Sequence, residues 1–139
     1  LRDVYKRQIY EDVDIFAKMH EEQGTMTKED YETYANLFDA MVMTPYFPKP
    51  DVLVFLECDY EEVIERIKAR GRQMEIDTDP EYWKKLFDRY NQWISDFNAC
   101  PVVRVNINEY DLYKQPDSLD HVIEKIKHVI ETARQTDPR

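Results

Sequence analysis

Glycine is nearly absent from this sequence, with only Gly24 and Gly71 among 139 residues. A loop that cradles phosphate groups at the start of a helix needs several glycines, so we expect no such loop within the chain. The sequence also has no run of about 18 apolar residues, which excludes a predicted membrane-spanning helix. Two cysteines and three histidines, none at metal-ligand spacing, predict neither a disulfide framework nor a metal site.

Positive charge is also scarce. Lys and Arg total 19 against 29 Asp and Glu, and the formal net charge of -10 argues against a nucleic-acid polymer as a partner. The hydrophobic fraction of 42% is typical of a folded domain rather than a disordered chain. We therefore expect a cytoplasmic protein that has neither a membrane nor a nucleic acid as its partner.

Local patterns predict helices that alternate with strands. Apolar residues at helical spacing predict helices near 9–22, 31–42, 60–70, 83–97 and 116–133. Short β-branched runs predict strands at 52–58 and 102–107, the first of them buried. We expect the polar segment 73–78 to be a mobile loop. The order predicts an α/β fold with a parallel sheet and flanking helices, of which this mostly helical chain holds two strands.

Several residues mark the predicted helix ends. Thr27 with Asp30, and Asp59 with Glu62, have the spacing of a capping box. Gly71 is expected to end the helix that follows Asp59, and Pro80 is expected to begin the next helix. The first helix is expected to bury one side made of Ile9, Val13, Phe16 and Ala17, with His20 on the same side.

An arginine cluster follows the first predicted strand. Arg66 and Arg70 are four residues apart on one side of a predicted helix, and Gly71 lets Arg72 turn back toward them. Three guanidinium groups in one place suit a polyphosphate, because phosphoryl transfer needs fixed cations around the developing charge. The alternative is a solvated basic surface near a helix C-terminus, where the helix dipole favours cations.

A second candidate site lies in the first helix. Asp12 and Phe16 are one turn apart, so a carboxylate and an aromatic ring project together. A carboxylate can accept from an exocyclic amine while a ring stacks on a base, each contributing about 1–3 kcal/mol. The alternative is an ordinary amphipathic turn with acids near its start and Phe16 in the core.

These motifs together resemble the deoxynucleoside kinase family. The string IYEDVDIFAK, which starts at Ile9, is similar to the family's base-binding helix, and Arg66–Arg72 is similar to its Arg-x-x-x-Arg-Gly-Arg lid. The segment 108–110 resembles the loop that contacts adenine, and 83–97 resembles the helix after the lid. The resemblance covers about residues 9–133 and implies a P-loop kinase-type fold, with this chain as its C-terminal portion.

The resemblance implies a role for each matching residue on the nucleoside side. Asp12 would hydrogen-bond the nucleobase, Phe16 would stack on it, and Glu75 would accept the sugar 3′-hydroxyl. An acid at position 12 suits bases with an amino group, so we favour deoxyadenosine or deoxyguanosine, with deoxycytidine next. The implied activity is ATP-dependent 5′-phosphorylation of a deoxynucleoside in nucleotide salvage.

The resemblance also implies roles on the donor side. Arg66, Arg70 and Arg72 would grip the phosphates of ATP, with Arg66 the catalytic residue nearest the transferred group. Glu109 and Tyr110 would border the donor adenine. Mg²⁺ would accompany ATP and be held mainly by residues upstream, and the full-length protein is expected to be a homodimer.

The sequence departs from the family pattern at its start. The family has an acidic residue, Arg and Ser before its base-binding helix, and this chain has Lys6, Arg7 and Gln8 there. Arg7 coincides with the family arginine, but both of its neighbours differ. We therefore expect residues 1–8 to be a non-native leader and 9–139 to be the C-terminal part of one kinase domain. Without a phosphate-binding loop, the chain alone is expected to be inactive.

Two other functions remain open from the sequence. A thymidylate-kinase-like nucleoside monophosphate kinase shares a similar lid. A non-catalytic helical interaction module would use the aromatic helix 83–97 as its partner surface, although core packing also explains its aromatic stripe.

Overall fold

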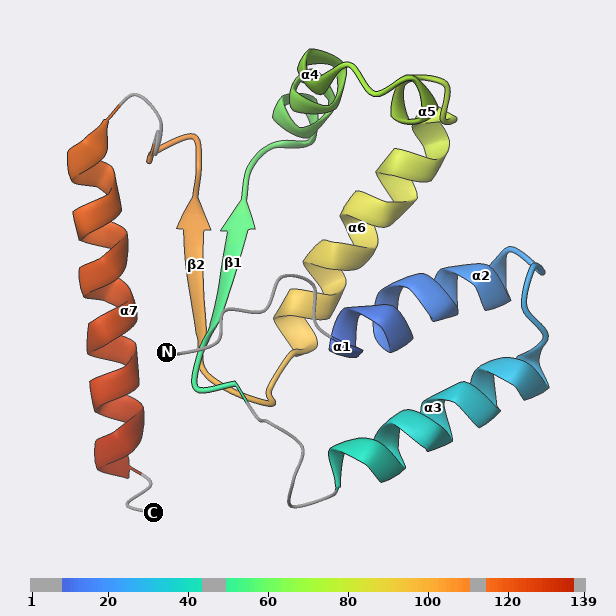
Figure 1. The fold of residues 1–139 in the computed structure, drawn as a ribbon, viewed down its shortest axis with the longest axis horizontal. Coiled ribbons are helices and arrows are strands. Elements are labelled where there is room, and N and C mark those ends of the chain that lie inside the picture. Colours follow the sequence, from blue (N-terminus) through green and yellow to red (C-terminus); the bar gives the residue numbers. More distant parts are fainter. Residues whose placement is uncertain (1–8, 44–49, 111–114, 137–139) are drawn as a thin grey trace.

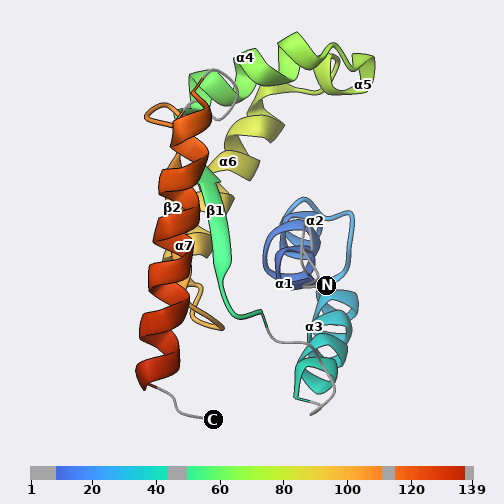
Figure 2. The same cartoon turned by 60° about the vertical axis from the view of Figure 1, so that its left-hand side comes forward.

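A computed structural model describes residues 9–43, 50–110 and 115–136 of the chain. Two parallel strands, β1 (Leu53–Glu57) and β2 (Val102–Asn106), pair in register from Leu53 opposite Val102 to Glu57 opposite Asn106. Helix α7 (Pro116–Thr136) lies on one side of the strands, and the helices of residues 9–42 and 80–96 lie on the other (Figures 1 and 2). The α/β class and the parallel pairing are confirmed.

The first helical segment is wider at its centre than the sequence pattern predicts. It consists of α1 (Ile9–Glu11), the π-helix η1 (Asp12–Ala17) and α2 (Lys18–Glu22). Burial follows the altered winding: Ile15 is fully buried and Met19 is 5% exposed, whereas His20 is exposed and Phe16 is half-buried. The predicted burial of Val13 and Ala17 is confirmed, but the placement of His20 on the buried side is wrong.

Helix α3 (Lys28–Val42) begins at the predicted cap. The Oγ1 of Thr27 accepts from the backbone N–H of Asp30 at 3.1 Å, as a capping residue does. No residue of α3 is buried, and Tyr34, Leu37 and Met41 remain exposed on it. Phe38 and Val42 pack against the core cluster formed by the first segment and the helix of residues 80–96.

The strands carry a core on each face of the sheet. Val103 and Val105 pack with Val122 of α7, and Leu53 and Phe55 pack on the opposite side. Residues paired across parallel strands point to the same face, so Val54 and Leu56 share the α7 side. They are 39% and 55% exposed because α7 covers β2 more than β1. The prediction of a wholly buried first strand is therefore wrong.

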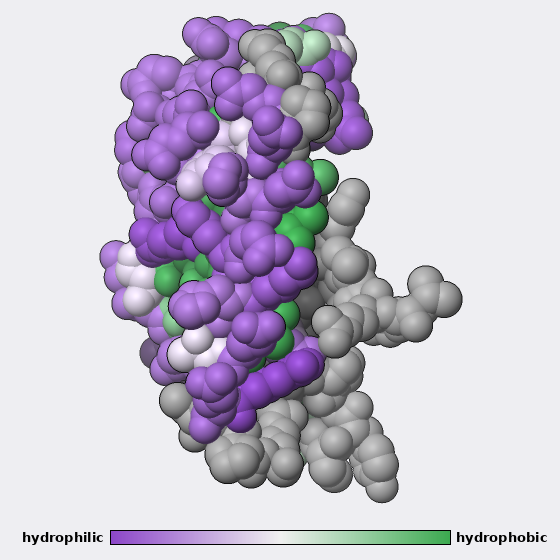
Figure 3. Space-filling model, turned by 90° about the vertical axis from the view of Figure 1, so that its left-hand side faces the viewer, coloured by the Kyte–Doolittle hydropathy of each residue, from purple (hydrophilic) through white to green (hydrophobic). Residues whose placement is uncertain are grey.

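Figure 3 views the molecule from the α7 side. Most of this surface is hydrophilic, and hydrophobic patches lie among the polar residues. Among the described residues, no helix has both the length and the apolar character that crossing a membrane requires.

Three helices lie between the strands in sequence. Helix α4 (Tyr60–Arg70) ends at Gly71, whose φ of 72° is the left-handed conformation that glycine adopts without strain. Residues 73–78 are not simply a loop, because α5 (Gln73–Ile76) forms one turn of helix there. Helix α6 (Pro80–Asp96) starts with Pro80 at its first turn, and the Oδ1 of Asp79 accepts from the N–H of Glu81 at 2.9 Å.

The predicted capping box at Asp59 does not form. Asp59 precedes α4, but its side chain makes no capping hydrogen bond. Its Oδ2 instead accepts from Nδ2 of Asn108 at 3.0 Å. A contact with a residue 49 positions away has replaced the local one.

Candidate active site

The arginines after β1 are gathered around one carboxylate. Arg70 donates to Oε2 of Glu75 through Nε at 2.9 Å and through Nη2 at 2.5 Å. Arg72 donates to Oε1 of the same carboxylate at 3.3 Å. The hydrogen bonds from Arg70 and then the charges of both arginines lower the pKa of Glu75. The short helix α5 creates this arrangement by turning Glu75 back toward the end of α4.

Arg66 lies one turn earlier and has a different partner. Its Nε donates to Oε1 of Glu62 at 2.6 Å within α4, and its side chain is half exposed. The structure therefore brings Arg70, Arg72 and Glu75 into direct contact and places Arg66 on the preceding turn. Ion pairs made by exposed arginines contribute little to stability. An incoming anion can therefore displace the carboxylates from the three arginines at a small cost in free energy.

Asp12 and Phe16 both lie on the π-helical segment. Asp12 is exposed, and Phe16 is half-buried and meets the ring of Tyr90 in a T-shaped contact, at a centroid distance of 6.3 Å. A π-helical turn inside an α-helix is rare and often marks a functional site. The sequence pattern predicted that the two residues lie one α-helical turn apart. In the structure both lie within the π-helix from Asp12 to Ala17.

Helix α6 holds this segment through polar contacts. The hydroxyl of Tyr90 donates to Oε2 of Glu11 at 2.9 Å, and Nε1 of Trp93 donates to Oδ2 of Asp14 at 3.2 Å. Burial raises the pKa of Asp14, and the hydrogen bond from Trp93 partly offsets that effect. The predicted core role of the aromatic stripe is confirmed at Trp93 and Ile94, which are 7% and 4% exposed.

Residue spacing alone did not identify Glu11, Asp14, Tyr90 and Trp93 as members of the candidate site. Helical spacing gave Tyr90 and Trp93 the signature of core residues. Both have a polar tip, and a buried aromatic residue of this kind needs a hydrogen-bond partner. The sequence could therefore show that Tyr90 and Trp93 each need an acceptor. It could not show that the acceptors are acids 79 residues away.

An apolar hollow of about 240 Å³ adjoins both groups of candidate residues. It lies between β1, α4 and α6, and its lining includes Phe55, Cys58, Trp83 and Tyr90. The indole of Trp83 donates to the backbone oxygen of Glu75 at 3.3 Å, whereas Tyr90 contacts Phe16. An aromatic wall on α6 thus links the carboxylate near the arginines to the ring near Asp12.

Helix α6 also sets the spacing of the two groups. Trp83 contacts the segment that holds Glu75, and Trp93 contacts Asp14. Ten residues of α-helix separate the two indoles, which corresponds to about 15 Å along its axis.

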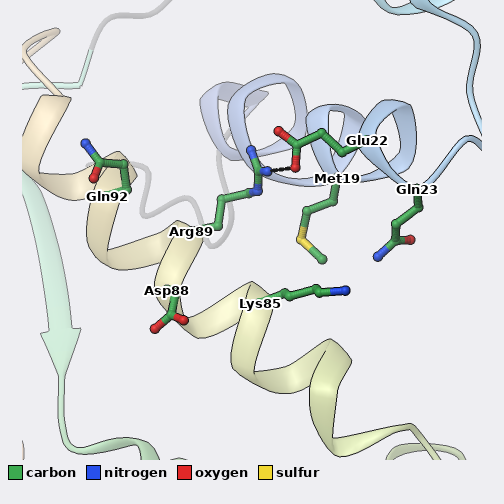
Figure 4. Close-up of a pocket in the computed structure, with 7 residues that line it drawn as sticks. All are labelled: Met19, Glu22, Gln23, Lys85, Asp88, Arg89 and Gln92. Carbon is green, nitrogen blue, oxygen red and sulfur yellow. Dashed lines mark hydrogen bonds and ion pairs between the residues drawn. The ribbon is translucent and has the colours of Figure 1, made fainter.

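A larger hollow of about 430 Å³ opens between α2 and α6 (Figure 4). It is lined by Met19, Glu22, Gln23, Lys85, Asp88, Arg89 and Gln92, and Arg89 forms an ion pair with Glu22 across it. Its charges are mixed and already include this internal pair, so it favours no single class of ligand.

Glu109 and Tyr110 lie beyond the end of β2. Tyr110 is half-buried, accepts from Nζ of Lys125 at 2.9 Å and packs against the cluster of Val103, Val105 and Val122. Glu109 is exposed. The hydrogen bond from Asn108 to Asp59 joins this loop to the start of α4. The segment that follows β1 and the segment that follows β2 therefore lie together at one edge of the sheet. Ligands of open parallel sheets bind at this edge.

The described residues contain no group of three or more His, Cys, Asp and Glu side chains placed to hold a metal ion. Arg66, Arg70 and Arg72 are suited to phosphate oxygens. Cys58 and Cys100 are free thiols, and burial raises the pKa of both.

Comparison with known proteins gives a consistent result. Residues 2–131 match the deoxynucleoside kinase family. The chain is 54% identical over 127 residues to deoxyadenosine/deoxycytidine kinase of Bacillus subtilis, covering 91% of the chain and 58% of that protein. It is 37% identical over 108 residues to deoxyadenosine kinase of Dictyostelium discoideum, covering 77% of the chain and 43% of that protein.

A solved structure agrees with the sequence relatives. Deoxyadenosine kinase from M. mycoides with bound dCTP superposes with a TM-score of 0.66 at 25% identity, over 88% of the chain and 62% of that structure. The chain thus spans about three fifths of the length of the B. subtilis relative and of this structure.

Proposed function

Because the chain belongs to the deoxynucleoside kinase family, we propose that the protein containing it transfers the γ-phosphoryl group of ATP to the 5′-hydroxyl of a deoxyribonucleoside. Family membership favours this reaction over nucleoside monophosphate phosphorylation and over a non-catalytic interaction module. The complete catalyst needs a phosphate-binding loop, for which this chain has too few glycines. The inactivity of the chain alone stays a prediction.

The observation that carries the proposal is the placement of Arg66, Arg70 and Arg72 on and just after the helix that follows β1. Their present partners are carboxylates, which phosphate oxygens can replace with charge-assisted hydrogen bonds of the same kind. Arg66 is assigned to the transferred phosphoryl group and the other two to the remaining phosphates. Glu109 and Tyr110 are assigned to the border of the donor adenine.

Glu75 is assigned to the sugar 3′-hydroxyl. Its carboxylate is only 19% exposed and is held by two arginines. A lowered pKa keeps it ionised and therefore an acceptor for a hydroxyl group. Phosphate oxygens that replace this carboxylate on Arg70 and Arg72 would free it to accept from the sugar, so the sugar and the donor phosphates are expected to meet at this residue.

Asp12 is assigned to recognition of the base, with Phe16 stacking on it. A carboxylate accepts from the amino group of adenine, cytosine or guanine, and it opposes the carbonyl of thymine. The B. subtilis relative is a deoxyadenosine/deoxycytidine kinase, and other relatives are deoxyadenosine and deoxyguanosine kinases. We therefore propose deoxyadenosine and deoxycytidine as the first substrates, with deoxyguanosine next.

Three further properties belong to the proposal. Mg²⁺ arrives with ATP, because the arginine cluster supplies cations rather than metal ligands. The full-length protein is a homodimer, a state for which the exposed apolar residues of α3 offer surface. Its location is the cytoplasm, where free thiols such as Cys58 and Cys100 stay reduced.

The test is a competition assay on the full-length gene product with Asp12→Ala. The variant should lose activity on deoxyadenosine and gain relative activity on thymidine. Deoxyadenosine loses a charge-assisted hydrogen bond, and thymidine no longer faces an opposed acceptor. The ratio of kcat/KM for thymidine to kcat/KM for deoxyadenosine should therefore rise by about 10- to 100-fold. Asp120→Ala, an exposed acid on α7, is the matched control. An unchanged ratio would make Asp12 a helix acid without a role in base choice, and phosphorylation of thymidine monophosphate instead would replace the proposed reaction.

A further inference from the structure

Two donors on α6 hold the acids on either side of Asp12. Tyr90 donates from its hydroxyl to Glu11, the preceding residue, and Trp93 donates from its indole to Asp14, two residues beyond. The donors are three residues apart on α6, and the acceptors are three residues apart on the first segment, so the two faces match in spacing.

This pairing affects how Asp12 is presented. Glu11 and Asp14 lie on one side of their helix, and Asp12 is displaced from Glu11 by about a quarter of a turn. Fixing the two neighbours against α6 therefore fixes the direction of the carboxylate between them. Asp12 itself is exposed, as a group that meets a ligand must be before the ligand binds.

Tyr90 makes a second contact with the same segment. Its ring meets Phe16 in an edge-to-face arrangement with an interplanar angle of 80°. It also lies against Trp93, at a centroid distance of 6.3 Å, and lines the apolar hollow beside β1. One side chain therefore contacts the candidate stacking ring, the neighbour of the candidate base-binding acid and the hollow between the two groups.

The winding of the segment makes such support necessary. Asp12–Ala17 is π-helical, a conformation that is rare and normally limited to a single turn. The packing of Ile15 and Met19 against Trp93 and Ile94 stabilises it from the apolar side. The hydrogen bonds from α6 also fix the orientation of the segment. A hydrogen bond requires a particular distance and angle to each acid, whereas apolar packing does not.

We infer that Tyr90 and Trp93 are positioning residues for the nucleobase, acting through Glu11, Asp14 and Phe16. This inference rests on the proposed function. It assigns part of the base specificity to α6, a helix that follows the lid and whose two donors lie 79 positions in sequence from the acids they contact. Tyr90 aligns the acid and the ring together, and Trp93 anchors the far side of the turn.

The experiment compares Tyr90→Phe with Tyr82→Phe in the full-length gene product. Both changes remove one hydroxyl from α6, and the Tyr82 ring, like that of Tyr90, packs beside the core. Tyr90→Phe keeps the ring against Phe16 and loses the bond to Glu11. It should raise the KM for deoxyadenosine about five- to tenfold, with the KM for ATP unchanged, because one hydrogen bond of about 1 kcal/mol orients the acid. Tyr82→Phe should leave both values at the wild-type level.

A second variant separates orientation from stability. Tyr90→Leu also removes the ring contact with Phe16, so its KM for deoxyadenosine should exceed that of Tyr90→Phe. Melting temperatures of all variants are measured in parallel. A lower melting temperature with both KM values unchanged would show that Tyr90 only stabilises the fold, and the inference would be overturned. If the wild type phosphorylates no deoxynucleoside, the proposed function itself fails and the inference falls with it.

Discussion

Replacement of Trp93 by Phe tests how strongly α6 is bound to the first helical segment. Trp93 is 7% exposed, belongs to the core cluster with Tyr10, Ile15 and Met19, and donates to Asp14 at 3.2 Å. Phenylalanine fits the space but lacks the pyrrole part of the ring. Burying ~40 Å² less apolar surface costs about 1 kcal/mol. Loss of the hydrogen bond to a partly exposed carboxylate costs about 1 kcal/mol more.

We therefore expect Trp93→Phe to lower the free energy of unfolding by about 2 kcal/mol. Urea unfolding of the full-length gene product, followed by far-ultraviolet circular dichroism, measures this change. Trp83→Phe is the matched control, because Trp83 is half-buried on the same helix and donates to a backbone oxygen. Its expected loss is about 1 kcal/mol.

A double-mutant cycle isolates the hydrogen bond from the packing. Asp14→Ala is combined with Trp93→Phe, and the coupling energy is expected to be about 1 kcal/mol. Strictly additive effects would refute the idea that this bond holds the π-helical segment. A loss at Trp93 no larger than the loss at Trp83 would refute the assignment of Trp93 to the core contact.

Two further changes test the electrostatics of the site. Burial raises the pKa of Asp14, so the stability of the wild type should fall as pH rises from the usual carboxyl pKa through the raised folded value. Asp14→Asn keeps an acceptor for Trp93 and removes this loss. It should be more stable than the wild type at pH 7 and equal to it at pH 3, as measured by urea unfolding at both pH values. Arg66→Ala should lower kcat about 10²- to 10³-fold with little change in the KM for the nucleoside, in steady-state assays of the full-length gene product. An effect confined to KM would assign Arg66 to ground-state binding.

Local chemistry in the sequence determined most helix ends and the strand pairing. Thr27 caps α3, Gly71 ends α4 and Pro80 starts α6, each as predicted, because a cap or a stop depends on residues within about one turn. The parallel arrangement followed from the alternation of strands with helices. The family motifs likewise lay in short strings, and the family assignment is confirmed.

Other features depended on residues that are distant in sequence. The turn of helix at α5 brings Glu75 to Arg70 and Arg72, although the polar segment had predicted a loop. Asp59 is recruited by Asn108 across 49 positions instead of capping its own helix. The exposure of Val54 and Leu56 depends on how far α7 extends over the sheet.

The candidate base-binding segment shows the division most clearly. The sequence by itself placed Asp12 and Phe16 in one helix, because their spacing and residue types are local properties. Only the tertiary structure showed the π-helical winding and the contacts of Tyr90 with Glu11 and of Trp93 with Asp14. Periodicity identifies which face of a helix is apolar, but not which polar groups meet across 79 residues. That pairing is decided when α6 packs against the first helix, because only then do the donors and acids come within hydrogen-bonding distance.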